Sequence, residues 1–261
     1  LIVVLGFVRY YRNKLNELAQ QNQQDASIQD GTLSPSEFEG SVPQYYAVSY
    51  DLPTNLSFAG ERVPIEIPDV VERLDREMQI NIYLHSSTIF LIKRANRWLP
   101  QMEEILRKHN IPDDFKYLPL IESGLLNDIS PKEAVGFWQI LKTSGRELGL
   151  EIDKEIDERY DPLKATEAAC KYLNNAYKKF GNWTLVAASY NRGIAGVGRA
   201  LEKQQVDNFY DLHLVEETSR YVFRIIAIKE IVENPVKYGF NINPKHLYQP
   251  EKLRYVEVKE T

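Results

Sequence analysis

The sequence predicts an all-α protein, and three observations support this class. From residue 69 onward, apolar residues recur at the three- and four-residue spacing of a helix face. Asp, Asn, Gly and Pro stand at the ends of these periodic stretches, where such residues start or stop helices. The alternation of apolar and polar residues that would predict strands is scarce. With 261 residues, 43% of them apolar, the chain is long enough for one large or two small domains with a buried core.

The residues before position 69 predict little regular structure. Residues 1–8 are wholly apolar and are followed by Arg9, Arg12 and Lys14. Eight residues are too few to span a bilayer, which needs about 20. We expect the end of a truncated signal or membrane anchor; the alternative is a buried strand or a frayed terminus. Residues 20–43, rich in Gln, Ser, Asp and Gly, predict a linker, and the prolines within residues 45–68 predict an extended arm.

Residues 69–110 predict a group of three helices. Asp69 is a suitable N-cap for the first, which carries an apolar stripe. Ser86 and Ser87 predict the start of the second, which Pro100 ends or kinks. The third covers residues 101–109.

Residues 111–234 predict the main helical domain. A helix from about Asp113 is bent by Pro119, so that Glu122 falls near its C-terminal end. Residues 130–133 (SPKE) resemble a capping box at the start of another helix. Asp161 and Pro162 repeat the start signal. Gly181 predicts the end of this last helix.

Three more helices complete the predicted domain. Asn182 caps a short helix through Tyr190, residues 191–193 interrupt it, and another helix continues to about Lys203. The last covers residues 216–232. We therefore expect five parts: an apolar segment at 1–14, a linker or arm at 15–68, a helical extension at 69–110, a main domain at 111–234 and a tail at 235–261.

Charge, cysteine and histidine usage exclude several classes of function. The net charge of −5 gives no overall basic field, so we expect no nucleic-acid partner. A single cysteine, Cys170, excludes an intrachain disulfide framework and a multi-cysteine metal site. The histidines show no metal-ligand spacing, and no phosphate-loop, dinucleotide or serine-hydrolase motif is present. We expect no metal and no cofactor. The four histidines are His85, His109, His213 and His246.

Glu122 is the candidate catalytic residue. It follows the apolar run at 118–121 and precedes Ser123. Apolar surroundings disfavour the charged form of a carboxyl and raise its pKa, as the general acid of a glycosidase requires. The alternative is a solvated glutamate at a helix end.

Other stretches fit a sugar-binding groove around this acid. Aromatic rings stack on pyranose faces, and the amides of Gln139 and Asn191 suit hydroxyl and acetamido groups. Each residue also has a structural explanation: Gly136 would allow close packing, and Trp138 and Tyr221 would be core. A two-carboxylate mechanism needs a second acid. The sequence does not single out a second acid, although Asp128, Glu133 and Glu217 are candidates.

Six motifs occur in a fixed order along residues 69–232. They are LPLIES (118–123), AVGFWQILKTSGRELGL (134–150), DERYDP (157–162), AACKYL (168–173), ASYNRG (188–193) and ETSRYV (217–222). Together they resemble the soluble-lytic-transglycosylase-like catalytic domain, which is related to goose-type lysozymes, and within it the membrane-bound D-type branch. Arg192 departs from the small residue usual after the asparagine, and a long cation there could alter saccharide contacts or pair with an acid.

The resemblance implies a lysozyme-like fold and an enzyme of the bacterial cell wall. Glu122 would act as general acid and then general base on the β-1,4 bond between N-acetylmuramic acid and N-acetylglucosamine of peptidoglycan, leaving a 1,6-anhydromuramoyl end. The residues it implies for substrate binding are Ser123, Gly136, Trp138, Gln139, Tyr190, Asn191 and Tyr221. It also implies the periplasm or cell envelope, with membrane association through the N-terminus. The alternatives are a goose-lysozyme-type muramidase and an inactive glycan-binding module.

Overall fold

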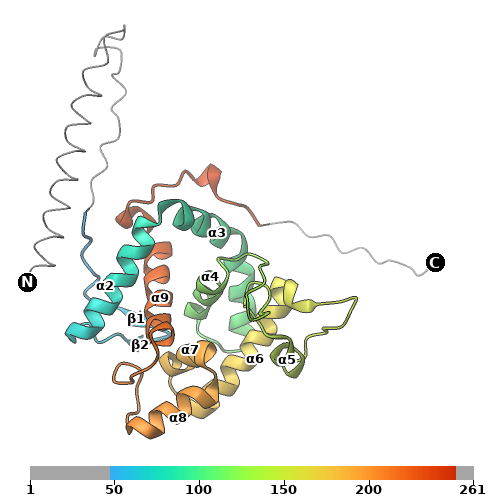
Figure 1. Cartoon of the computed structure of the whole chain (residues 1–261). Coiled ribbons are helices and arrows are strands. Elements are labelled where there is room, and N and C mark those ends of the chain that lie inside the picture. The colour runs from blue at the N-terminus through green and yellow to red at the C-terminus, as the bar shows by residue number, and fades with distance from the viewer. Residues whose placement is uncertain (1–47, 251–261) are drawn as a thin grey trace, which may run out of the picture. The chain divides into compact units, whose positions relative to one another are not determined.

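The structure, a computed structural model, describes residues 48–250 and confirms the all-α class (Figure 1). From Ser49 onward the chain forms one compact unit. The predicted apolar segment at 1–14, the linker at 20–43 and the end of the tail lie outside the described residues. No helix within residues 48–250 is both long and apolar enough to cross a membrane.

The segment before the first described helix holds a small β-hairpin. Strands β1 (Ser57–Phe58) and β2 (Glu61–Arg62) pair antiparallel. Phe58 is fully buried and packs against Phe115. The Glu61 carboxylate accepts hydrogen bonds from the backbone amides of Trp183 (2.5 Å) and Thr184 (2.9 Å). The hairpin is therefore fixed to the first turn of α7 (Trp183–Arg192).

The predicted helical extension consists of two helices, and two details of its prediction are wrong. In α2 (Pro68–Tyr83) Ile67, not Asp69, occupies the cap position, because Pro68 already begins the first turn. Asp69 instead pairs with Arg73 one turn on. Helix α3 (His85–Lys108) is continuous, with Pro100 inside it. Leu99 and Met102 on either side of this proline are buried, so tertiary packing holds the helix together where its backbone bond is lost.

The segment carrying Glu122 is short and irregular, with Glu122 at the predicted helix end. The 3₁₀ helix η1 (Asp113–Tyr117) leads directly into α4 (Leu118–Glu122). Pro119 lies in the first turn of α4, where a proline needs no amide partner.

The helix predicted from the SPKE capping box does not form. Ser130 accepts from the Ala134 amide through Oγ (3.0 Å), but its backbone amide donates to the Ala134 carbonyl (2.9 Å) and closes a turn. Glu133 has φ +61°, which ends any helical path there. A helix that the pattern did not predict follows instead, α5 (Lys142–Glu147).

The predicted caps of the next helices are confirmed. Helix α6 (Pro162–Phe180) follows η2 (Glu158–Tyr160), and the Asp161 carboxylate accepts from the amides of residues 163 and 164. Gly181 ends α6 in the left-handed conformation, φ +60°. Asn182 caps α7, and α8 (Ile194–Gln204) follows the break at Gly193.

Helix α9 (Glu216–Glu233) is the central element of the core. It packs against α2, α7 and α4 (Figure 1), and half of its residues are buried. The chain then turns through η3 (Pro235–Tyr238) and η4 (Pro244–His246), with Tyr238 and Phe240 buried. Cys170 is fully buried in α6, and burial raises the pKa of its thiol to about 12.

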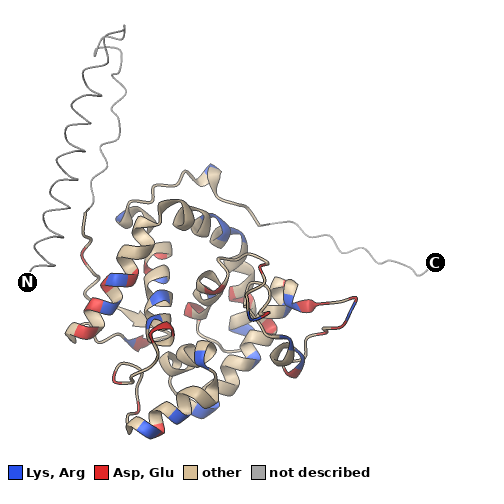
Figure 2. Cartoon of the chain, in the orientation of Figure 1, with Lys and Arg blue, Asp and Glu red and all other residues tan. Residues whose placement is uncertain are grey.

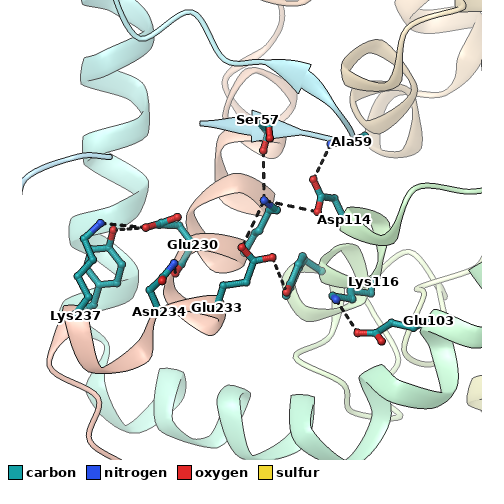
Figure 3. Close-up of polar contacts among 12 residues, drawn as sticks. Ser57, Ala59, Glu103, Asp114, Lys116, Glu230, Glu233, Asn234 and Lys237 are labelled. Carbon is teal, nitrogen blue, oxygen red and sulfur yellow. Dashed lines mark hydrogen bonds and ion pairs between the residues drawn. The ribbon is translucent and has the colours of Figure 1, made fainter. Parts of the chain in front are cut away.

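A polar network joins α9, η1 and the hairpin (Figure 3). Lys229 lies 3.7 Å from Asp114 and 3.5 Å from Glu233. Asp114 accepts from the Ala59 amide (2.7 Å), and Tyr117 donates to Glu233 (3.1 Å). These bonds fix the segment that leads into Glu122.

Candidate active site

Glu122 and Tyr221 form the centre of the site. Glu122 is the last residue of α4, and its carboxylate accepts a hydrogen bond from the Tyr221 hydroxyl of α9. Tyr221 is only 2% exposed, whereas Glu122 is partly exposed. The acid therefore reaches the surface while its partner is held within the core.

Burial is the main influence on Glu122 and raises the pKa of its carboxyl above the ordinary range. The negative charge of Glu217 acts in the same direction, and the Tyr221 hydrogen bond and the Arg224 charge act against it. Arg224 donates to the Ile121 carbonyl (2.9 Å), which holds it beside the acid. The carboxyl thus keeps its proton to a higher pH than an exposed glutamate does. When it ionises, the Tyr221 hydroxyl donates a hydrogen bond to the carboxylate.

A rigid turn follows the acid at residues 135–140. Gly136 has φ +78°, and a Cβ on it would lie 2.1 Å from the Arg159 carbonyl oxygen. The Gln139 side-chain amide donates to the carbonyls of Gly136 (2.9 Å) and Asp128 (3.1 Å). Because its amide group donates to these backbone carbonyls, Gln139 stabilises the turn.

Trp138 is not a sugar-stacking surface. Its side chain is fully buried, and Nε1 donates to Thr166 Oγ1 of α6 (2.8 Å). An indole with no exposed face cannot contact a saccharide, so the expected stacking role is wrong for this residue. Trp138 instead anchors the turn to α6.

Tyr190 and Asn191, at the end of α7, connect that helix to the turn and to α9. The Tyr190 hydroxyl donates to the Trp138 carbonyl (2.8 Å), and burial raises the pKa of this hydroxyl well above its ordinary value. Asn191 accepts from Thr218 Oγ1 (2.7 Å) and donates to Glu217 (3.4 Å).

Ser123 joins α4 to the turn. Its hydroxyl donates to the Phe137 carbonyl (2.9 Å) and accepts from the Leu126 amide (3.4 Å). Among residues 48–250, this hydroxyl therefore bonds to backbone groups and not to the Glu122 carboxylate. Of the three other acids, Glu217 is exposed and close enough to influence Glu122 electrostatically. Asp128 and Glu133 support the turn through their backbone carbonyls.

Sequence reasoning missed two arginines that shape the site. Arg224 lies three residues after Tyr221, so helical spacing could have placed it on the same side of α9. Arg159 is buried and donates to the carbonyls of Glu133 and Ile140 (both 3.1 Å), while pairing with Asp157. Arg159 lies in the DERYDP motif, which marked this stretch in the sequence. The sequence alone did not show to which carbonyls Arg159 donates.

Comparison with known proteins agrees with this geometry. Residues 102–212 match the family described as "Transglycosylase SLT domain". The chain is 29% identical over 195 residues to the membrane-bound lytic murein transglycosylase D of Escherichia coli strain K12, and equally to that of E. coli O6:H1 strain CFT073. Each alignment covers 71% of this chain and 42% of the relative, so the chain spans less than half the length of these proteins.

Proposed function

We propose that the protein is a peptidoglycan lytic transglycosylase, because residues 102–212 match the family described as "Transglycosylase SLT domain". It cleaves the β-1,4 bond between N-acetylmuramic acid and N-acetylglucosamine without water and leaves a 1,6-anhydromuramoyl end. Such an activity serves cell-wall turnover or remodelling.

Glu122 performs both proton transfers of this reaction. The protonated carboxyl donates its proton to the glycosidic oxygen, and the bond from that oxygen to the muramoyl anomeric carbon breaks. The resulting carboxylate accepts the proton of the muramoyl C6 hydroxyl, whose oxygen attacks the anomeric carbon. The hydroxyl of Tyr221 stabilises the carboxylate between the two steps.

The observation that carries the proposal is the Glu122–Tyr221 pair. Burial favours the protonated acid and the tyrosine hydrogen bond favours the carboxylate, so one residue can serve in both states. A hydrolase that uses two carboxylates needs its second acid about 5–9.5 Å from the first. Glu217 influences Glu122 through its negative charge, which raises the pKa of the Glu122 carboxyl.

Mass spectrometry of digested peptidoglycan tests the reaction. We expect anhydromuramoyl ends; reducing ends would assign the protein to the alternative, a goose-lysozyme-type muramidase. Glu122→Gln is expected to abolish cleavage while glycan binding is retained.

Glu217→Gln is the matched control for the acid. It removes the nearby charge that raises the pKa of Glu122, so cleavage should persist and the pH–rate limb of Glu122 should move to lower pH. Undiminished cleavage by Glu122→Gln would show that Glu122 is not the general acid and base of the reaction. A wild-type protein that binds glycan and cleaves nothing would instead be the inactive binding module.

For localisation we propose the cell envelope. The support is the name of the E. coli relatives, which are membrane-bound, together with the apolar run at 1–8 and its flanking basic residues. The finer proposal is a periplasmic catalytic domain attached to a membrane through the N-terminus. Fractionation of the cells that naturally make the protein tests it: the protein should sediment with membranes and be released by detergent, and recovery in the fraction without membranes would contradict the proposal.

A further inference from the structure

Positive charge is concentrated on α6, α7 and α8, next to the candidate active site. Residues 171–205 contain six Lys or Arg and one acidic residue, Glu202. This stretch has a formal charge of +5 in a chain whose net charge is −5. Figure 2 shows Lys and Arg in bands along α8. We call the exposed set Lys178, Lys179, Arg192, Arg199 and Lys203 the basic face.

Two glycines allow cations of the basic face to lie on α8. A Cβ at Gly196 would come within 3.0 Å of Arg192 Cγ, and a Cβ at Gly198 within 2.8 Å of Lys179 Nζ. The aliphatic part of Arg192, the last residue of α7, lies against Gly196 of α8. Arg199 and Lys203 are four residues apart on α8, which places them on the same side of that helix. The result is a row of cations, not a scatter.

The cations of the basic face have no acidic partners. Among residues 48–250, none of the five makes an ion pair or a side-chain hydrogen bond with another described residue. Several other cations among residues 48–250 are paired, as Arg220 is with Glu77 and Lys116 with Glu103. A concentration of one sign of charge without internal partners attracts an anionic ligand.

The basic face begins at the edge of the active site. Arg192 directly follows Asn191, which bonds to Thr218 and Glu217 of α9. From Gly196, against which Arg192 lies, to Lys203 the row extends about 10 Å at the helical rise, enough for about three residues of an extended peptide.

We propose that Arg192, Arg199 and Lys203 bind the carboxylates of the peptide stems that branch from the glycan strand. This inference rests on the proposed function, because that activity brings a peptide-bearing strand to Glu122. The glycan backbone is largely neutral, whereas the stems carry free carboxylates at neutral pH. The basic face therefore selects strands that retain their stems.

The test compares two substrates and two triple variants of the full chain. The substrates are peptidoglycan strands with intact stems and strands stripped of stems by an amidase. The lactyl carboxylates that the amidase exposes are then coupled to methylamine, which keeps the stripped backbone neutral. The first variant is Arg192→Gln, Arg199→Gln and Lys203→Gln. The control variant, Lys108→Gln, Lys154→Gln and Lys245→Gln, removes the same charge from three exposed cations on separate elements.

We expect the first variant to lose about tenfold in kcat/KM on stem-bearing strands at low salt, through KM and with kcat unchanged. Its kinetics on stripped strands should equal those of the wild type. Raising the ionic strength from about 0.02 to about 0.5 M should abolish the difference, because salt screens the attraction. The control variant should behave as the wild type on both substrates.

Equal losses on both substrates, or no loss on either, would overturn the inference. Binding of the Glu122→Gln protein to both kinds of strand gives a readout that does not need cleavage. If the wild type cleaves neither substrate, the proposed function fails, while salt-sensitive binding that depends on stems and on the basic face would still support the inference. Equally tight binding to vesicles of anionic phospholipid, lost in the first variant, would assign the basic face to a membrane and overturn the stem assignment.

Discussion

At the scale of the residue, the hydroxyl of Tyr221 has a measurable effect on the acid. We expect Tyr221→Phe to reduce kcat/KM by about tenfold to a hundredfold, because a hydrogen bond to a charged group contributes roughly 1.5–3 kcal/mol. The bond lowers the pKa of Glu122, so its loss should move the pH–rate limb to higher pH. A pH profile of kcat/KM measures both effects.

Tyr177→Phe provides the matched control for this variant. Tyr177 stacks on Trp183, with ring centroids 4.0 Å apart, away from Glu122. The same atom is removed, and activity and pH profile should be unchanged. If the pH–rate profile of Tyr221→Phe showed the same apparent pKa for Glu122 as the wild type, this result would contradict the hydrogen bond between Tyr221 and Glu122.

The raised pKa of Glu122 also makes a prediction about stability. A carboxyl with a higher pKa in the folded than in the unfolded state contributes stability below its unfolded pKa and loses it as pH rises through the folded pKa. Above the unfolded pKa, the buried carboxyl therefore makes the wild type less stable than a neutral side chain of the same shape would, and Glu122→Gln supplies that neutral side chain. Urea unfolding should show the variant to be more stable at pH 7 and similar to the wild type at pH 3; a variant destabilised equally at both would oppose this reading.

Residue types predicted the buried environment of Glu122 well and that of the aromatic residues less well. The catalytic role of Glu122 stays a prediction. Glu122 was identified from its apolar neighbours, which are local in sequence. The burial of Trp138 depends on Thr166 of α6, 28 residues away, and nothing near Trp138 in the sequence encodes that distance. The roles in substrate binding proposed for Ser123, Gln139, Tyr190 and Asn191 stay predictions.

At the scale of the element, the turn at 135–140 has no room for a side chain at Gly136. Gly136→Ala would place Cβ 2.1 Å from the Arg159 carbonyl oxygen at φ +78°. We expect a loss of about 2–4 kcal/mol in the free energy of unfolding from backbone strain and overpacking. Gly60→Ala is the control, since φ is also positive there but no atom lies within 4 Å of the added Cβ. Equal losses in denaturant unfolding would show that strain alone is responsible.

The contact of α2 with α9 supports the position of Tyr221. Glu77 of α2 is 1% exposed and accepts two hydrogen bonds from Arg220, the neighbour of Tyr221 (2.6 and 3.2 Å). Glu77→Gln should destabilise the protein by about 2 kcal/mol, because Arg220 keeps its charge with the exposed Glu216, 3.8 Å away, as its remaining acidic partner. If this pair also holds Tyr221 in place, the loss of activity should not add to that of Tyr221→Phe in the double variant.

Glu66→Gln is the control for the ion pair. Glu66 pairs with Arg62 on the surface, where both side chains are more than half exposed. Its replacement should change neither stability nor activity appreciably. Fully additive activity losses for Glu77 and Tyr221 would limit Glu77 to a structural role.

Caps were predictable and loops were not. Asp161, Asn182 and Gly181 act on amides and carbonyls within a few residues, so local chemistry decides them. The SPKE turn failed because Ser130 and Ala134 bond reciprocally, which residue types alone do not distinguish from a cap. Pro100 does not interrupt α3 because buried neighbours hold the helix on both sides.

At the scale of the whole molecule, the folding unit is larger than the matched family domain. Residues 102–212 exclude α2 and α9, yet α9 contributes Tyr221 and a large part of the core. We expect a fragment of residues 102–212 to show no cooperative thermal unfolding and no cleavage. A fragment of residues 48–250 should unfold in one transition and remain active. Circular dichroism melting and product analysis check both, and a cooperative, active short fragment would refute the dependence on α9.

The all-α class was predictable because helical spacing is a repeated local signal. The assembly around α9 was not, since which face of each helix meets it depends on contacts across more than 100 residues, as between Glu77 and Arg220. The resemblance to a known domain supplied the site residues that spacing alone left open.

The position of Cys170 has a practical consequence. As the one thiol of the chain, it is fully buried, and burial raises its pKa to about 12. A maleimide added to the native protein should therefore react only when α6 separates from the core. The labelling rate then reports how often the molecule opens, without any engineered probe, and the stability of each variant above can be compared in the same tube as its activity.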